Sequence, residues 1–307
     1  MSNEITTLKV AYIPEHFSTP LFFAEQQGYY ESQNLKIEFV KVLEGTGRLV
    51  KLLNDGEVDI AIGLTEGFIA DLAKGNDSYK LIDTYVNSPL LWAVSTGSNR
   101  NELTKVDQLD GKSIGVSRIG SGSYIMSFVL AHDLKFSKEF SNFPILSTFK
   151  NLRDSVNHKL EDKELNSDAF MWEYFTSKKY YDNGEIKQIG QIYTPWPSWV
   201  ITANAKTLES KNEAIKAFVS SVNKGINYFN VNKDKAIEYI GENLDYSKED
   251  AGEWIKTVNF NSKVGQDELN WEAVVGKTSE ILKIAGVLTD SDEVISSRLE
   301  STVLKKL

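Results

Sequence analysis

The residues best suited to ligand chemistry form a glycine-rich turn in the run GKSIGVSRIGSGSYIM, at positions 111–126. The pattern predicts a buried strand over 113–117, a turn that contains Arg118 and Ser121, and a helix that opens at Ser123. A helix N-terminus presents unsatisfied backbone N–H groups and the positive end of the helix dipole. With one guanidinium and two hydroxyls beside it, this turn is typical of a site for a small anion or polar group.

The same turn also fits an ordinary strand-to-helix connection, with Ser121 or Ser123 capping the helix. It lacks the Gly-Lys-Ser/Thr ending of a phosphate-binding P-loop. It also lacks the third glycine of a dinucleotide loop, because Ile125 occupies that position. We therefore expect a ligand role without a nucleotide for Arg118, Ser121, Gly122, Ser123 and Tyr124.

Comparable polar turns follow the strands predicted in the first hundred residues. One runs from His16 to Pro20, and proline fits the first turn of the helix that follows. Another carries Thr46 and Arg48 at the start of a second predicted helix. A lone histidine or arginine is often only a capping or surface residue, but the carboxyl ends of strands are where ligands bind in α/β sheets. The expected contacts are His16, Phe17, Thr19, Pro20, Thr46 and Arg48.

Two predicted strands end in the same way. In GEVDIAIGLTEG (56–67) and in ELNSDAFMWEY (164–174), a polar turn precedes an acidic residue, an apolar strand and a glutamate. Such a glutamate is usually solvated or paired with a cation. Two of them at one ligand would favour a molecule with amino or ring N–H donors over a purely anionic one. The candidates here are Leu64, Thr65, Glu66, Trp172 and Glu173.

Aromatic residues lie at several predicted strand ends and crossovers. They are Phe17, Tyr124, Trp172, Trp196 and Trp199. Large aromatics are mostly core residues, but Trp196 lies between two prolines, in a segment too stiff to form a core strand. An aromatic wall with carboxylate acceptors suits a flat heteroaromatic ring, such as an aminopyrimidine, better than an inorganic oxyanion.

The elements that position these residues repeat a strand–helix order twice, which predicts two α/β lobes with parallel-type sheets. The expected strands are 8–13, 35–43 and 58–62 in the first lobe, and 113–117, 145–149 and 168–172 in the second. Helices are expected at 20–27, 49–53, 123–130 and 151–160. The β-like runs 90–95 and 199–203 are interpreted as crossovers between the lobes. Further amphipathic helices are predicted at 214–229, 236–244, 251–258, 269–285 and 293–304.

Composition narrows the function classes. The 307 residues are 41% hydrophobic and 25% charged, which is a normal globular mixture. A net charge of −9 argues against nucleic-acid binding. The chain has no cysteine, which excludes disulfides, thiolate zinc sites and thiol catalysis, and its three histidines lie far apart. We expect no metal site.

The N-terminus leads directly into the first strand, without a basic region or an apolar segment typical of a signal peptide. The sequence as written therefore favours a cytoplasmic protein, or a periplasmic or extracellular one if a signal peptide was removed. No run approaches the roughly 18 apolar residues of a membrane span. We expect a monomer that binds a small molecule, with no nucleic-acid partner and no membrane insertion, and with an unidentified transporter or sensing partner.

Four runs in order resemble one known family: KVAYIPEHFSTPLFFAEQQGYY, GEVDIAIG, LDGKSIGVSRIGSGSYIM and YTPWPSWVITANAKTL. Together they are similar to the type II periplasmic solute-binding proteins of the nitrate, sulfonate and taurine group. That group also contains thiamine-pyrimidine-precursor binders and the related pyrimidine synthase of fungal thiamine biosynthesis. The resemblance implies two sheets flanked by helices and a hinge that closes both lobes on one ligand. Lobe one would comprise 1–90 and 200–307, and lobe two 91–199.

Non-enzymatic binding without a cofactor is the leading expectation. The pyrimidine synthase carries a lysine that anchors pyridoxal phosphate after its Val-Asp motif, a histidine consumed as substrate, and a cysteine-rich iron motif. Here Gly63 and Gly67 follow Val58-Asp59, and cysteine is absent. Three alternatives stay open. They are a sulfonate- or nitrate-type anion binder of an uptake system, an enzyme related to pyrimidine synthesis, and a cytoplasmic ligand sensor.

Overall fold

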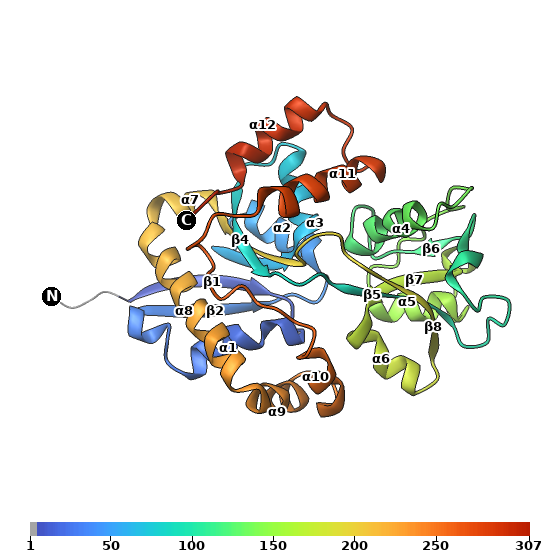
Figure 1. Cartoon of the computed structure of the whole chain (residues 1–307), viewed down its shortest axis with the longest axis horizontal. Helices are drawn as coiled ribbons and strands as arrows, with labels where there is room; N and C mark the ends of the chain where they lie inside the picture. The colour runs from blue at the N-terminus through green and yellow to red at the C-terminus, as the bar shows by residue number, and fades with distance from the viewer. Residues whose placement is uncertain (1–4) are drawn as a thin grey trace. The chain divides into compact units, whose positions relative to one another are not determined.

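The computed structural model describes residues 5–307 and contains two compact units (Figure 1). Unit 1 comprises the residues up to Ser88 together with Trp196–Ser279 and Asp290–Leu307; unit 2 comprises Pro89–Pro195 and Glu280–Thr289. These boundaries differ by a few residues from the predicted lobes, and Glu280–Thr289, which falls in the predicted lobe one, belongs to unit 2. A helical pattern does not reveal which core a helix joins. Residues 1–4, where no signal peptide was predicted, lie outside the described part of the chain.

Unit 1 is built on a five-stranded sheet in the order β2-β1-β3-β9-β4. Its strands are β1 (Thr6–Tyr12), β2 (Leu35–Lys41), β3 (Ile60–Leu64), β4 (Tyr79–Val86) and β9 (Trp199–Asn204). β1 is parallel to β2 and β3, whereas β9 is antiparallel to β3 and β4. The run interpreted as a crossover, 199–203, is therefore also a central strand of this sheet.

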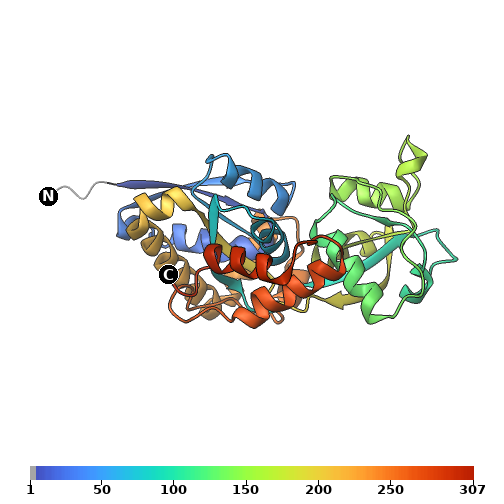
Figure 2. The ribbon, with the colours of Figure 1, turned by 90° about the horizontal axis from the view of Figure 1, so that it is seen from above.

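Helices lie on both faces of the unit 1 sheet (Figure 1 and Figure 2). They are α1 (Thr19–Gln26), α2 (Thr46–Asn54), α3 (Thr65–Ala73), α7 (Ala205–Ser210), α8 (Asn212–Val231), α9 (Lys233–Asn243), α10 (Lys248–Trp254) and α12 (Asp292–Thr302). Single turns of 3-10 helix occur at His16–Ser18 and Glu31–Gln33. The predicted helix 269–285 consists of a π-helical turn, Glu272–Gly276, followed by α11 (Lys277–Ile284).

Unit 2 repeats the arrangement with a four-stranded sheet in the order β6-β7-β5-β8. Its strands are β5 (Leu91–Gly97), β6 (Ile114–Gly115), β7 (Ala169–Glu173) and β8 (Ile186–Tyr193); its helices are α4 (Gly122–Asp133), α5 (Phe149–Val156) and α6 (Tyr174–Asp182). Short 3-10 turns lie at Val106–Leu109 and Lys163–Leu165. The predicted strand 145–149 is reduced to one parallel bridge between Val116 and Ile145.

The two sheets correspond strand by strand. β1, β3, β9 and β4 of unit 1 match β6, β7, β5 and β8 of unit 2 in order and direction, and the Val116–Ile145 bridge takes the place of β2. The expected α/β class, with two sheets flanked by helices, is confirmed. The sheets are mixed because the crossover strands β5 and β9 run antiparallel to their neighbours.

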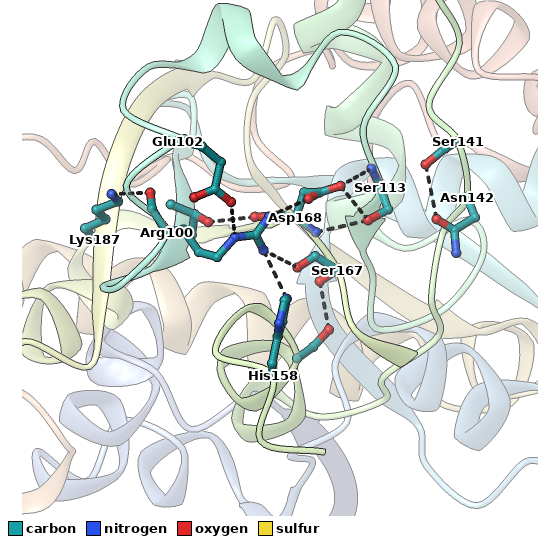
Figure 3. Close-up of polar contacts among 11 residues, drawn as sticks. Arg100, Glu102, Ser113, Ser141, Asn142, His158, Ser167, Asp168 and Lys187 are labelled. Atoms are coloured by element: carbon teal, nitrogen blue, oxygen red, sulfur yellow. Dashed lines mark hydrogen bonds and ion pairs between the residues drawn. The ribbon is translucent and has the colours of Figure 1, made fainter. Parts of the chain in front are cut away.

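In each unit, an aspartate that immediately precedes a strand accepts a backbone N–H at the neighbouring parallel strand. The aspartates are Asp59 before β3 and Asp168 before β7. The N–H of Lys9 donates to Asp59 Oδ2 at 2.8 Å, and the N–H of Ser113 donates to Asp168 Oδ2 at 3.0 Å. In unit 2, Arg100 extends this contact, because its Nη2 lies 2.6 Å from Asp168 Oδ1 (Figure 3). The acidic residue of both predicted strand motifs therefore has the same structural role, which is to fix two neighbouring parallel strands.

Figure 3 shows that Arg100 is the centre of this polar network. Its Nε contacts Glu102 Oε1 at 2.5 Å, and its Nη1 lies 3.2 Å from His158 Nε2. Burial raises the pKa of Asp168, but the N–H of Ser113 and the Arg100 guanidinium outweigh burial and hold this pKa below its usual value. The network lies at the amino end of β7, the end opposite to the predicted ligand residues.

Candidate ligand-binding site

The candidate residues of unit 1 gather at the carboxyl ends of β1 and β3, where ligands bind in α/β sheets. His16–Ser18 and α1 follow β1, and α3 begins directly after β3. Since β9 runs antiparallel to β3, its first residue, Trp199, pairs with Leu64, the last residue of β3. The sheet order thus brings turns from positions 16, 65 and 199 to one edge.

His16 lies in an aromatic stack and has no exposed surface. Its ring is parallel to those of Tyr246 and Trp254, with centroids 4.4 and 4.1 Å away, and Phe17 meets it edge-on at 4.6 Å. Burial lowers the pKa of His16 well below its ordinary value, so the ring is neutral. The sequence did not indicate this stack, because its two outer rings come some 230 residues later in the chain.

Phe17 connects this stack to the edge of the sheet. Its ring centroid lies 5.0 Å from that of Trp199, and its carbonyl accepts a hydrogen bond from the hydroxyl of Tyr85 at 2.7 Å. Thr19 donates its hydroxyl to the His16 carbonyl at 2.7 Å, and Pro20 lies in the first turn of α1. All of these side chains are buried.

Thr46, at the start of α2, fixes the end of β3. Its Oγ1 accepts the N–H of Leu64 at 3.1 Å. A Cβ on Gly67 would lie 2.6 Å from Thr46 Cγ2, and one on Gly63 would lie 2.6 Å from Leu49 Cδ1. Side chains are therefore absent at Gly63 and Gly67 because α2 packs against the backbone there. Arg48, two residues further along α2, is half-buried.

Glu66 and Trp196 form a buried pair at the start of α3. Trp196 Nε1 donates to Glu66 Oε2 at 3.0 Å, and the two residues are 2% and 1% exposed respectively. Thr65 donates its N–H to the Ser198 carbonyl and its hydroxyl to the Pro197 carbonyl. As expected, the proline-flanked segment is not a strand, yet the Trp196 side chain is buried because Glu66 supplies an acceptor for its indole.

The glycine-rich turn of unit 2 is organised by capping. Ser121 is the N-cap of α4, and its Oγ accepts the N–H of Tyr124 at 3.3 Å. Ser123 Oγ lies 2.9 Å from Ser121 Oγ and accepts the N–H of Ser117 at 3.3 Å. Both hydroxyls therefore have partners within the turn. Gly122 is the first helical residue, so α4 starts one residue earlier than predicted.

Arg118 and Tyr124 flank this turn and are both half-buried. Arg118 Nη1 donates to the Ile119 carbonyl at 3.3 Å. Tyr124 meets the rings of Phe128 and Phe143 edge-on at 5.0 and 4.8 Å, and burial raises its pKa. Tyr124 thus contributes to an aromatic cluster of unit 2.

Trp172 and Glu173 are the last two residues of β7, but their side chains lie in different surroundings. Trp172 is half-buried and stacks on Phe149 at 5.0 Å, with the core around Phe170. Because side chains alternate along a strand, Trp172 and Glu173 point to opposite faces of the sheet. The two residues therefore do not act at one point.

Glu173 is 5% exposed and is the N-cap of α6. Its Oε2 accepts the N–H of Thr176 at 2.7 Å and the hydroxyl of Thr176 at 2.8 Å. Burial raises the pKa of Glu173 to about 7, so near neutral pH the carboxyl exists in both protonation states. Burial also raises the pKa of Tyr181, whose hydroxyl lies 2.5 Å from Ser95 Oγ, to about 12.

Two further features are absent from residues 5–307. No cluster of three or more histidine, cysteine, aspartate or glutamate side chains with the geometry to hold a metal ion occurs in this range. No helix in the same range is long and apolar enough to cross a membrane.

Comparison with known proteins identifies the family. A family model described as Ca3427-like PBP matches residues 92–192. The structure of the Candida albicans CA3427 gene product, described as defining a new family with the generic periplasmic binding protein fold, is 65% identical. It covers 98% of this chain and 97% of its own, with a TM-score of 0.94. A comparison with curated protein sequences found no match.

More distant structures share the fold. The alkanesulfonate-binding protein SsuA from Xanthomonas axonopodis pv. citri, bound to MOPS, has a TM-score of 0.74 at 14% identity, and 99% of each chain is covered. The periplasmic nitrate-binding protein NrtA from Synechocystis PCC 6803 has a TM-score of 0.72 at 15% identity, with 98% and 87% covered. The 65% identity over nearly the whole length shows that the chain belongs to the Ca3427-like family of proteins with the periplasmic binding protein fold.

Proposed function

We propose that this chain binds one small polar molecule at the carboxyl ends of its sheet strands, without catalysing a reaction. The proposed ligand is a flat heteroaromatic, such as a thiamine-related aminopyrimidine. Family membership supports small-molecule binding. The choice of ligand rests on the side chains at the carboxyl ends of the strands.

A buried glutamate at the end of the central strand of each unit carries this proposal. Glu66 follows β3 and Glu173 ends β7, and both are at least nine-tenths buried. An ionised carboxylate only accepts hydrogen bonds, so it favours a ligand that brings N–H donors and disfavours a purely anionic one. The rings of Phe17 and Trp199, whose centroids are 5.0 Å apart, are flat apolar groups of the kind that packs against an aromatic ligand.

A sulfonate- or nitrate-type anion is the second candidate. SsuA and NrtA, whose descriptions name such ligands, share the fold. Arg48 and Arg118 are half-buried cations at the predicted turns and would be the groups that attract an anion. The two candidates therefore depend on different side chains, which makes them separable by substitution.

A thermal-shift panel tests the proposal, with the hydroxymethyl aminopyrimidine of thiamine, methanesulfonate, nitrate and pyridoxal phosphate as probes. A ligand at 100 times its Kd stabilises the folded state by about 2.7 kcal/mol. We expect the aminopyrimidine to raise the melting temperature and the two anions to leave it unchanged. If an anion alone stabilises the protein, the aminopyrimidine proposal is wrong.

Substitutions then locate the site. Glu66→Gln and Glu173→Gln should each weaken binding of the aminopyrimidine about tenfold, because an amide NH2 group replaces one of the two acceptor oxygens of the carboxyl group. Glu209→Gln, on the exposed surface of α7, is the matched control and should bind as wild type. Equal affinity in all three variants would show that neither Glu66 nor Glu173 contributes to binding.

Uptake and sensing share every residue of the proposed site, and only cellular context separates them. The Escherichia coli sulfonate-binding protein SsuA, which has the same fold, is described as periplasmic. Fractionation that finds this chain outside the cytoplasm, together with a permease, would favour uptake. Recovery from the cytoplasm would favour sensing or carriage.

A further inference from the structure

Two buried indole groups occupy matching places in the two units. Trp199 Nε1 in unit 1 and Trp92 Nε1 in unit 2 are both shielded from solvent and have no hydrogen-bond partner within residues 5–307. The side chains are 2% and 3% exposed. A buried tryptophan normally finds a partner for its N–H, and a buried donor without one calls for an explanation.

Strand pairing places these two tryptophans at equivalent positions in the two sheets. Trp199 begins β9 and pairs with Leu64, the last residue of β3. Trp92 lies at the start of β5 and pairs with Glu173, the last residue of β7. β9 corresponds to β5 and β3 to β7, so each indole lies at the carboxyl edge of its own sheet. This is the edge at which α/β sheets hold ligands.

The neighbours of the indoles are also the proposed ligand residues. Trp92 and Glu173 are directly opposed across β5 and β7, so their side chains project from the same face of the sheet. The Trp199 ring lies 5.0 Å from that of Phe17. A donor-only indole thus stands next to an acceptor-rich carboxyl in unit 2, and next to an aromatic surface in unit 1.

We infer that Trp92 and Trp199 are each a hydrogen-bond donor for a bound molecule at the carboxyl edge of their own sheet, where the indole N–H meets an acceptor atom of that molecule. This inference rests on the proposed function and sharpens it, and it adds Trp92, which sequence reasoning missed. The ligand must carry acceptors beside donors. The ring nitrogens and amino group of an aminopyrimidine meet both requirements, whereas an oxyanion offers acceptors only.

The first test removes the N–H while preserving shape. Benzothienylalanine, in which sulfur replaces the indole N–H, is placed site-specifically at position 92, 199 or 196. Trp196 is the matched control, because its N–H donates to Glu66 within the protein. Without ligand, replacement at 92 or 199 should leave the melting temperature unchanged or raise it, whereas replacement at 196 should lower it. An equal loss at all three positions would show that the fold itself uses these N–H groups, and would overturn the inference.

The second test measures binding of the hydroxymethyl aminopyrimidine by calorimetry. Replacement at 92 or at 199 should weaken its binding about tenfold. In ¹H–¹⁵N NMR spectra of the six indole N–H groups, the signals of Trp92 and Trp199 should shift when the aminopyrimidine is added. Wild-type affinity in both variants would overturn the inference while the proposed function stands. If none of the aminopyrimidine, methanesulfonate, nitrate and pyridoxal phosphate probes binds, the proposed function fails and this inference falls with it.

Discussion

Gly67→Ala should destabilise the protein, although alanine is the better helix former. The new Cβ would lie 2.6 Å from Thr46 Cγ2 and 3.1 Å from Thr46 Cβ, about 1 Å inside the best carbon–carbon separation. Overpacking of this kind costs about 1–3 kcal/mol, and replacing a helical glycine by alanine returns about 0.5–1 kcal/mol. The expected net loss is about 1–2 kcal/mol, or a fall of about 2–8 °C in melting temperature.

A double-mutant cycle identifies the cause. Thr46→Ser deletes the methyl that Gly67→Ala would strike and keeps the Oγ1 that accepts the Leu64 N–H. Alone it should cost about 1 kcal/mol for one buried methyl. The double variant should be no less stable than Thr46→Ser, which corresponds to a coupling energy of about 1–2 kcal/mol.

Chemical denaturation of the four proteins measures this coupling. Gly252→Ala in α10 is the matched control, since its Cβ would lie 3.7 Å from Ile237 Cδ1, an ordinary contact, and it should stabilise by about 0.5–1 kcal/mol. If Gly67→Ala proves as harmless as the control, or if the two substitutions are additive, the packing of α2 on α3 is not as described here. Displacement of Thr46 would also move Glu66, so a loss of ligand affinity should accompany the loss of stability.

Three further predictions concern titration and ion pairing. Burial raises the pKa of Glu173 from 4.5 to about 7. Its contribution to the free energy of unfolding is therefore complete below pH 4.5 and is lost as the pH rises through about 7. In denaturation experiments at a series of pH values, Glu173→Gln should remove a pH-dependent loss of about 3 kcal/mol. His16 has a lowered pKa, so its contribution is present above pH 6.5 and is lost as the pH falls; His16→Phe should flatten the acid side of the same profile, and unchanged slopes would contradict both assignments. Asp168→Asn should cost about 1–3 kcal/mol because Arg100 loses its half-buried partner, whereas Glu102→Gln at the exposed end should leave the melting temperature unchanged; equal effects would show that Asp168 is not the anchor.

Local patterns were enough to predict much of the framework. The strand–helix order, the glycine-rich turn and the paired acidic strands all rest on short-range periodicity and capping chemistry, which neighbouring residues dictate. α4 begins within a residue of its predicted start because Ser121 supplies the N-cap. The α/β class followed from the same patterns and is confirmed.

Contacts between distant segments were not predictable in this way. The stack on His16 depends on Tyr246 and Trp254, and the burial of Trp196 depends on Glu66, 130 residues away. The sequence patterns did not predict β4, β8, α3 and α6. Trp92 was interpreted only as part of a crossover, because its unpartnered N–H becomes evident only once β5 is paired with β7.

The ligand-binding role of the candidate site residues remains a prediction. The structure gives several of them a stabilising role as well, since Thr46, Ser121, Ser123 and Glu173 each accept a backbone N–H. Substitutions at these positions must therefore be read for binding and for stability together. A variant that loses affinity at unchanged melting temperature reports on the ligand, and one that loses both reports on the fold.

Isothermal titration of the unliganded wild-type chain with the hydroxymethyl aminopyrimidine of thiamine tests the central claim most directly. The proposed function predicts saturable binding of one molecule per chain. Binding should be abolished or strongly weakened when Glu66→Gln and Glu173→Gln are combined, and retained in Glu209→Gln. Heat of dilution alone, or saturation by nitrate or methanesulfonate in its place, would contradict the claim.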